Sequence, residues 1–497
     1  MLRTISTPLM LAFIAITGIF FSSDTCANSP LYEVTFKDTE RNQVHITAYL
    51  PVSNDKFMMT DAGSMPNRWA DFVNELNVYD EHGKQLNIEK ISPREWKIQD
   101  LTTDWVTLDY NIDLSHDEFK WPGGIDGVAF QTEQGIFATG RALFIMSDDL
   151  DSPATVKIKT PEAWSTHTPW QSKEELSFVV KHNIELSESM IMVGDVNSFT
   201  LDSTDLNVEF VLAGTALIEK ADVFKRRAQQ LLAYYTSLMG GLPQIPNVNS
   251  DGKMLVIINE HSQNDGEVIG SHISMLMNPD APASQQLINW FLYAHEFFHL
   301  WNGKTLKVES PHADWFKEGV TNYYTLKGLI QTGIIRKEAA FMVTNHLLYQ
   351  RYLNDSGLGE ISPSDAAVVN KDGHWGLVYG GGFFAGLALD VRIREKTTGE
   401  KSLDDVLRHL YINYSGEDTY YNNDDLQKII ADMGITSHAE IFRDHVLGTD
   451  KIEIAPIFRR YGFDATINEG QLIISDAEKK DQSVEELHAS FFGKLSQ

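Results

Sequence analysis

The sequence His-Glu-Phe-Phe-His at residues 295–299 constrains the fold and chemistry of this chain more than any other feature. Two histidines four residues apart on a helix project from one face, so their ring nitrogens can bind one metal ion. Glu296 between them would lie beside that ion, placed to accept a proton from a water molecule that the metal activates. Apolar residues recur at intervals of three and four around the pattern, which predicts a helix over residues 284–302.

A five-residue pattern can also arise by chance in a chain with 16 histidines, and the alternative interpretation is a core helix with two hydrogen-bonded histidines. A third ligand would distinguish a metal site from a core helix, because a catalytic zinc site uses three protein ligands and keeps one position open. Glu318 follows His299 after eighteen intervening residues, in a segment that reads as a second helix. His312 is another candidate, but it lies in a Ser-Pro-His-Ala turn with no helical phase to direct it. The metzincin arrangement would need Gly at 302 and His at 305, where the chain has Asn302 and Thr305.

The predicted metal centre therefore holds one zinc ion per chain, bound by His295, His299 and Glu318. Two imidazoles and a carboxylate with an open position favour zinc over other common metals. Such a metal lowers the pKa of a water molecule and polarises a carbonyl group. The predicted reaction is hydrolysis of a peptide bond, in which Glu296 takes the proton of the water and passes it to the leaving amine.

Longer stretches around these residues resemble the glycyl aminopeptidase family of metallopeptidases (family sixty-one), a gluzincin family with a distal glutamate ligand. The stretches are His-Glu-Phe-Phe-His-Leu-Trp-Asn at 295–302, Trp-Phe-Lys-Glu-Gly-Val-Thr at 315–321, Tyr-Gly-Gly-Gly at 379–382 and Lys-Ser-Leu-Asp-Asp-Val-Leu-Arg at 401–408. In the N-terminal half, residues 62–72 are similar to the family's Pro-Gly-Ser-Tyr motif. The resemblance covers about residues 30–465. It implies an aminopeptidase that favours small N-terminal residues such as glycine or alanine.

Three further residues enter as candidates around this centre. The resemblance implies that Tyr379, in the family's Tyr-x-x-Gly motif, donates a hydrogen bond to the oxyanion of the reaction. Without the resemblance, Tyr379 is one of 17 tyrosines in the chain, and a role in the core or on the surface would be its default interpretation. Asn322 lies one turn beyond Glu318 and is either a hydrogen-bond partner of a ligand histidine or a solvated helix residue. His374 is a candidate pocket residue, although a loop histidine without a known partner is more often structural.

One motif of the family is missing. Its aminopeptidases carry Gly-Gly-x-Glu-His on the strand that edges the substrate cleft, where the glutamate can hold the free α-amine of the substrate. Here the strand predicted over residues 271–277 puts Gly270 at the position of that glutamate, and Glu267 and His272 are candidate replacements that lie out of register. The sequence therefore leaves three alternatives open: an endopeptidase of the same fold, an inactive relative that binds peptides, and a metalloenzyme for other amides or esters.

The predicted architecture is multidomain, with an N-terminal all-β domain, an α+β thermolysin-like zinc peptidase core and a helical C-terminal domain. A positive start, an apolar run and small residues before the predicted cleavage site indicate a secretory signal peptide, so the protein is expected to be periplasmic or secreted. The predicted segments are a signal peptide at 1–27, the β-domain at 28–214, the gluzincin core at 215–335, the helical domain at 336–465, and an extension at 466–497 that is too short for a PDZ module.

Hydrophobic periodicity predicts the individual elements of these segments. The expected strands cover residues 31–36, 44–50, 105–114, 141–146, 155–159, 176–181, 208–212, 254–259, 271–277 and 471–474. The expected helices cover residues 216–239, 284–302, 314–331, 337–353, 381–397, 402–412, 423–433 and 484–495.

Composition limits the partners of the mature chain. The formal net charge of −28 would repel nucleic acid, so peptide or protein substrates are the expected partners. After the signal peptide no segment approaches eighteen consecutive apolar residues, and no membrane insertion is expected. The only cysteine, Cys26, leaves with the signal peptide, so the mature protein is expected to have no disulfide bonds. The sequence carries no signal for the oligomeric state.

Overall fold

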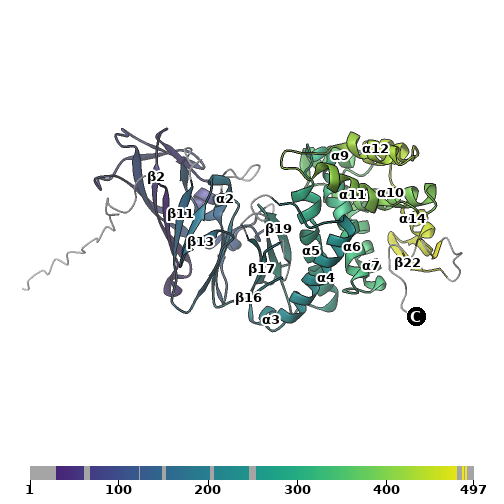
Figure 1. Ribbon diagram of the computed structural model, residues 1–497, viewed down its shortest axis with the longest axis horizontal. Helices are drawn as coiled ribbons and strands as arrows, with labels where there is room; N and C mark the ends of the chain where they lie inside the picture. The colour runs from purple at the N-terminus through teal and green to yellow at the C-terminus, as the bar shows by residue number, and fades with distance from the viewer. Residues whose placement is uncertain are drawn as a thin grey trace, which may run out of the picture.

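A computed structural model describes residues 29–60, 68–121, 124–147, 153–201, 206–245 and 253–477, with four further positions at 484, 485, 487 and 489. A β-rich N-terminal part, a central sheet and a helical C-terminal part follow one another along the long axis (Figure 1). This order confirms the predicted fold class. The predicted signal peptide, residues 62–67 of the N-terminal motif and most of the predicted helix at 484–495 lie outside the described residues.

The N-terminal part is built from three sheets. The largest has the strand order β13-β14-β11-β1-β2-β7-β4, and the other two have the orders β10-β3-β6-β5 and β12-β15-β9-β8. Strict alternation of buried and half-buried residues along β2 and β7 puts one face of the large sheet on the core. The strands are β1 (Leu31–Thr35), β2 (Gln43–Pro51), β3 (Lys56–Met58), β4 (Val73–Asp80), β5 (Ile88–Ser92), β6 (Glu95–Ile98), β7 (Trp105–Asp113), β8 (Ala129–Gln131), β9 (Gly135–Thr139), β10 (Met146–Ser147), β11 (Ala154–Lys159), β12 (Ser165–His167), β13 (Gln171–Glu174), β14 (Ser177–Val180) and β15 (Met190–Gly194).

Short helical turns connect these strands, and one of them replaces a predicted strand. The apolar run at 141–146 suggested a strand, but the chain forms the turn α1 (Gly140–Leu143) and only then enters β10. The turn begins at Gly140, where a Cβ atom would lie 1.8 Å from the carbonyl oxygen of Leu186, so this close approach requires glycine. The remaining turns are η1 (Asp38–Glu40), η2 (Arg68–Asp71), η3 (His116–Glu118) and α2 (Asn183–Ser187).

The central sheet is a layer shared by both halves of the molecule. Its order is β16 (Asn197–Thr200), β17 (Val208–Ala213), β18 (Met254–Glu260), β20 (His272–Met277) and β19 (Asp265–Ile269). Along β18, Val256 and Ile258 pack into the helical core, whereas Leu255 and Ile257 pack into the β-rich core. Burial on both faces explains why this strand is a continuous apolar run.

Two expectations about this sheet were wrong. The strand at 208–212 was assigned to the β-domain, but it pairs in parallel with β18 and so belongs to the core, which begins near β16. The strand at 271–277 was expected to edge the substrate cleft. It lies inside the sheet between β18 and β19, and the antiparallel strand β19 forms the edge.

Helices cover the face of the central sheet that points away from the β-rich part (Figure 1). Within the described residues, the stretch Gly376–Lys396 is apolar enough to cross a membrane, but 83% of its hydrophobic window is buried, as in a core helix. The hairpin of β21 (Phe463–Asn468) and β22 (Gln471–Asp476) follows the last of these helices. The helices are α3 (Thr215–Ile218), α4 (Ala221–Met239), α5 (Ala283–Phe298), η4 (Leu300–Thr305), η5 (Pro311–Ala313), η6 (Trp315–Val320), α6 (Thr321–Gln331), α7 (Lys337–Val343), η7 (Thr344–Tyr349), α8 (Gln350–Leu353), α9 (Pro363–Asn370), η8 (Gly376–Gly381), α10 (Gly382–Lys396), α11 (Leu403–Tyr414), α12 (Asn423–Asp432), α13 (His438–Ile441), η9 (Phe442–Val446) and α14 (Ile454–Arg460).

Candidate metal centre

The last turn of α5 carries His295, and His299 caps the C-terminal end of the same helix, so the four-residue spacing puts both on one face. Immediately afterwards the chain forms a wide helical turn, η4, in which Gly303 has a φ of 157°. A Cβ atom at Gly303 would lie 3.2 Å from Nδ1 of His299, so glycine leaves this imidazole the room to turn toward its partners.

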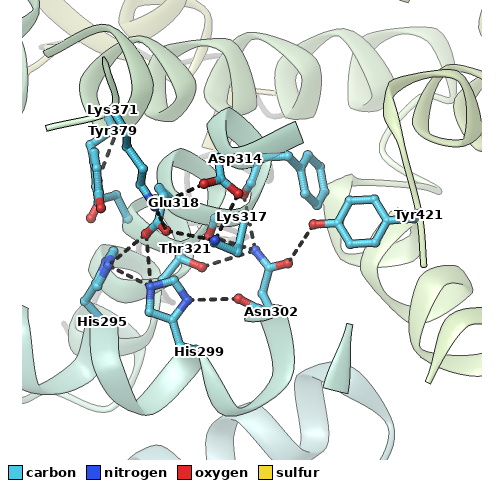
Figure 2. A network of polar contacts seen from close by, with 12 residues as sticks. His295, His299, Asn302, Asp314, Lys317, Glu318, Thr321, Lys371, Tyr379 and Tyr421 are labelled. Atoms are coloured by element: carbon cyan, nitrogen blue, oxygen red, sulfur yellow. Dashed lines mark hydrogen bonds and ion pairs between the residues drawn. The ribbon is translucent and has the colours of Figure 1, made fainter. Parts of the chain in front are cut away.

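Glu318, in the helical turn η6, completes a buried group of three ligand atoms (Figure 2). Nε2 of His295 lies 3.0 Å from Nε2 of His299, and Oε2 of Glu318 lies 3.5 Å and 3.1 Å from these two atoms. Ligand atoms at about 2.0 Å from a tetrahedral zinc ion would be separated by about 3.3 Å. The three side chains therefore fit a zinc ion without rearrangement, and they supply the nitrogen and oxygen donors that zinc prefers.

Second partners orient both imidazoles. Nδ1 of His299 donates to the backbone oxygen of Asn302 at 2.9 Å, which leaves Nε2 free to bind a metal. Nδ1 of His295 and Oδ1 of Asn322 are both buried, and neither makes a hydrogen bond of standard geometry. The Asn322 side chain nevertheless interacts with the His295 imidazole and is one of the groups that raise the pKa of His295. The net pKa of His295 falls to about 4, because burial and His299 outweigh Glu318 and Asn322. The imidazole is therefore neutral near pH 7, the form that binds metal.

Two lysines hold the second oxygen of Glu318. Oε1 accepts a hydrogen bond from Nζ of Lys371 at 2.6 Å and lies 3.4 Å from Nζ of Lys317, and Asp314 bridges the same two lysines (Figure 2). Burial alone would raise the pKa of Glu318, but Lys371 and His299 lower it well below its usual range. Glu318 is therefore an anion at neutral pH, with Oε2 left for a metal.

The side chain of Asn302 links the ends of the two ligand-bearing segments. Nδ2 lies 3.2 Å from the backbone oxygens of Phe316 and Lys317 and 3.1 Å from Oγ1 of Thr321, while Oδ1 accepts from the hydroxyl of Tyr421 at 3.3 Å (Figure 2). This buried amide connects the turn after α5 to η6 and the start of α6. It therefore fixes the position of His299 relative to Glu318.

Glu296 is a buried carboxyl group next to the edge strand β19. A Cβ atom at Gly266 would lie 3.1 Å from Cγ of Glu296, so the two residues are in close contact. Burial raises the pKa of Glu296 well above its usual range, and the neighbouring Glu318 raises it further. Its place beside the ligand group is the one from which a carboxylate could accept a proton from a water molecule, as a general base does.

Tyr379 lies above the metal ligands on the wall formed by η8. Its ring is 6.2 Å from that of His295 and stacks on Trp375 at 4.7 Å with an interplanar angle of 2°. Nζ of Lys371 lies 5.4 Å from the ring centroid. Burial, followed by the charge of Glu318, raises the pKa of the hydroxyl, so it stays protonated and can donate a hydrogen bond.

These residues line one large cleft of about 860 Å³ between the N-terminal part, β19 and the helices. Glu267, Asn322 and Tyr379 line this cleft together with the ligands and Glu296. Gly270 and His272 do not. They lie in the hairpin beyond β19, against Glu188 and Leu255 respectively, and line a different pocket.

His374 is also outside the lining of the cleft. Its Nδ1 lies 2.8 Å from Oδ1 of Asp355, so the structure favours the structural reading of this loop histidine. Of the two candidate replacements for the missing glutamate, Glu267 lines the cleft and His272 does not, because the edge strand β19, rather than the strand predicted at 271–277, carries the cleft-facing residues.

Sequence reasoning missed the residues that reach the site from distant segments. Lys371 comes from the loop after α9, and Trp121 and Gly124 come from the N-terminal part. Arg141, also from that part, pairs with Glu267 of the cleft wall. No local pattern marks such residues.

Comparisons with known proteins identify relatives of the chain. A model of the Peptidase M61 N-terminal domain matches residues 31–195, and a model described as M61 glycyl aminopeptidase matches residues 289–379. Together they match just over half of the chain. No curated protein sequence matches significantly.

Solved structures share the fold at low sequence identity. The chain is similar to an aminopeptidase N family protein from Idiomarina loihiensis, with a TM-score of 0.74 and 16% identity over 88% of this chain and 79% of that chain. It is also similar to an M1 zinc metallopeptidase from Deinococcus radiodurans, bound to a Tyr-Ser-Ala substrate, with a TM-score of 0.51 and 12% identity over 86% and 95% of the two chains. The chain therefore belongs to the M61 glycyl aminopeptidase family of peptidases.

Proposed function

We propose that this protein is a zinc metallopeptidase that hydrolyses peptide bonds with a zinc-activated water and acts as an aminopeptidase. One observation carries the proposal: the ligand atoms of His295, His299 and Glu318 converge at 3.0–3.5 Å from one another, beside the buried carboxyl group of Glu296. A preference for small N-terminal residues rests on the family description alone.

The residues of the cleft divide the reaction between them. When bound, zinc supplies Lewis acidity to a water molecule and to the scissile carbonyl group. Glu296, buried beside the ligand group and in contact with Gly266 of the edge strand, accepts the proton of the attacking water and transfers it to the leaving amine. Tyr379 donates a hydrogen bond to the oxyanion that forms from the carbonyl oxygen. Lys371 and Lys317 hold Glu318 in one orientation through Oε1.

Export and partners belong to the same proposal. The signal-like composition of residues 1–27 supports a periplasmic or secreted enzyme, and the net charge of −28 supports peptide rather than nucleic acid partners. We propose one zinc ion per chain and no membrane insertion once the leader is removed. An inactive binding module is less consistent with this chain, because all three ligands and Glu296 are in place.

The test uses the chain from residue 28 onward, assayed with unmodified peptides and mass spectrometry of the products. Activity is expected to disappear on chelation, to return with one equivalent of zinc, and to fall at least a thousandfold in Glu296→Gln. Glu440→Gln is the matched control, because its exposed side chain lies far from the ligands on α13. A zinc-loaded wild-type protein that cuts no peptide would reject the peptidase and favour the binding module.

A further inference from the structure

An arginine without a carboxylate partner lies on the wall of the cleft that carries Tyr379. Arg351, the second residue of α8, lines the same cleft as the three candidate metal ligands and is exposed to solvent. Among the residues that the structure describes, none forms an ion pair with its guanidinium group or accepts a hydrogen bond from it. The chain has 69 acidic residues and 41 basic ones, so the missing partner does not reflect a shortage of acids.

The nearest acidic side chain along the helix is occupied by other groups. Asp355 follows Arg351 by four residues, and its side chain is only 2% exposed. Oδ1 of Asp355 lies 2.8 Å from Nδ1 of His374, and Oδ2 accepts a hydrogen bond from the backbone N–H of Leu377 at 3.1 Å. Enough protein surrounds the guanidinium group of Arg351 to lower its pKa, and no described carboxylate raises that pKa in return.

An aromatic stack holds this guanidinium group in place. Cζ of Arg351 lies 4.5 Å from the centre of the Trp375 ring, and Trp375 stacks on Tyr379 at 4.7 Å with an interplanar angle of 2°. Stacking orients a planar cation and leaves the N–H groups at its edge free for a ligand. The two separations together place Cζ no more than about 9 Å from the centre of the Tyr379 ring.

Close packing between α8 and η8 fixes the backbone of Arg351 relative to Tyr379. A Cβ atom at Gly376 would lie 2.1 Å from the backbone oxygen of Arg351, and one at Gly380 would lie 2.8 Å from the backbone oxygen of Leu348. Neither position has room for a side chain, so the two helical turns lie directly against each other. The arginine is therefore positioned by the same element that carries Tyr379.

The other lysine and arginine side chains of the cleft lie among acidic groups. Lys317 and Lys371 form ion pairs with the carboxylates of Asp314 and Glu318. Burial lowers the pKa of Lys304, and the charges of three glutamates act against this decrease. The arginine of α8 is thus the cation of the described cleft wall whose charge no carboxylate of the protein offsets. Its position and its free donors suit an anionic group that arrives with the substrate.

We propose that Arg351 binds a carboxylate of the substrate and so selects peptides that carry one a few residues from the scissile bond. A guanidinium group presents paired N–H donors to the two oxygens of a carboxylate, which neutral groups do not match. An extended peptide advances about 3.3 Å per residue, so the separation of at most about 9 Å from Tyr379 corresponds to about three residues.

Two sources supply this chemistry: the C-terminal carboxylate of a short peptide, and the side chain of an aspartate or glutamate in a longer one. The inference rests on the proposed peptidase function and deepens it, because it names the class of peptide that the same cleft accepts.

Alanine peptides of two to six residues, each with a free or an amidated C-terminus, test the first source. The wild type is expected to prefer the free acid at least about tenfold in kcat/KM at a length of about three or four residues, mainly through KM. Arg351→Gln should abolish this preference. Arg351→Lys should keep part of it, since lysine retains the charge but loses the planar pair of donors. Arg443→Gln is the matched control, because it removes the same charge from a side chain that is 70% exposed and does not line the cleft.

Amidated alanine hexapeptides with one glutamate or glutamine at each position in turn test the second source. A preference for glutamate that Arg351→Gln removes would assign the site to acidic side chains, whereas a preference confined to the first series would assign it to the C-terminus. A wild type that treats acid and amide alike in both series would overturn the proposal and leave the peptidase intact. So would a preference that persists in folded Arg351→Gln protein, with melting temperatures as the measure of folding.

A binding measurement separates this inference from the proposed function. Glu296→Gln protein is titrated calorimetrically with the peptide pairs of both series, alone and combined with Arg351→Gln. Tighter binding of the carboxylate form, weakened at least about tenfold in the double variant, would support the site even if hydrolysis were absent. Equal binding of both forms, or binding of neither, would overturn it.

Discussion

Replacement of Asn302 by alanine should weaken both the fold and the metal centre. The two N–H groups of this buried amide are shared among three oxygen atoms, and its oxygen accepts from Tyr421. Three hydrogen bonds at about 1 kcal/mol each give an expected loss of about 3 kcal/mol in the free energy of unfolding. The bond from His299 to the backbone oxygen of residue 302 survives the substitution, so the imidazole keeps its direct partner.

The effect on zinc follows from the position of this amide between the two ligand segments. Without it, η6 is no longer tied to the turn that follows α5, and the 3.1 Å separation between His299 and Glu318 is less strictly held. Loss of such a supporting contact typically reduces metal affinity by about 10–100-fold. Asn302→Ala is expected to show a decrease in this range.

Two assays on the same protein samples test the reasoning. Urea denaturation of the metal-free protein gives the loss of stability, and competition with a zinc-binding chelator gives the affinity. Tyr421→Phe is the matched control, since it removes one of the contacts and should cost about 1 kcal/mol. A loss of stability below 1 kcal/mol in Asn302→Ala, or unchanged zinc affinity, would refute the proposed link between the two segments.

Two further results are expected. Tyr379→Phe keeps the stacking on Trp375 but removes the hydroxyl, so kcat should fall by about 10²–10³ with little change in KM or zinc content; an equal rise in KM would assign the hydroxyl to substrate binding. For Asp126, the folded-state pKa is raised, so its contribution to stability is full below the unfolded pKa of about 3.9 and is lost as the pH rises through the folded pKa. Asp126→Asn should therefore gain stability relative to wild type as the pH rises above the unfolded pKa of about 3.9, by up to about 1.4 kcal/mol per pH unit until the folded pKa is passed, and a pH-independent difference in melting temperature would contradict this.

The helical half of the molecule could be predicted closely from periodicity. The expected helix at 284–302 corresponds to α5 and the turn after it, and that at 314–331 corresponds to η6 and α6. Long amphipathic or apolar helices carry many repeats of one period, so local sequence determines them well. The three metal ligands were predictable for the same reason, because their spacing along the chain defines their geometry.

The wall of the cleft opposite the ligands was not predictable in this way. The strand β19 has only five residues, too few for a clear alternation of apolar and polar side chains. Its place at the edge of the sheet depends on pairing with β20, and the local sequence does not determine that pairing. Lys371 bonds to Glu318 across a sequence separation of 53 residues, a contact that only tertiary packing creates. A buried carboxyl group and a surface one look the same in a sequence, and only the surrounding fold distinguishes their pKa.

The shared central sheet has a consequence for how this enzyme can fail. The candidate metal ligands come from helices that pack on one face of this sheet, whereas Trp121 and Gly124, which line the cleft with them, come from the N-terminal part that packs on the opposite face. The two walls of the cleft are therefore built by separate parts of the chain that meet along one sheet. A packing defect in that sheet would displace one wall from the other even if the three candidate ligands kept their places.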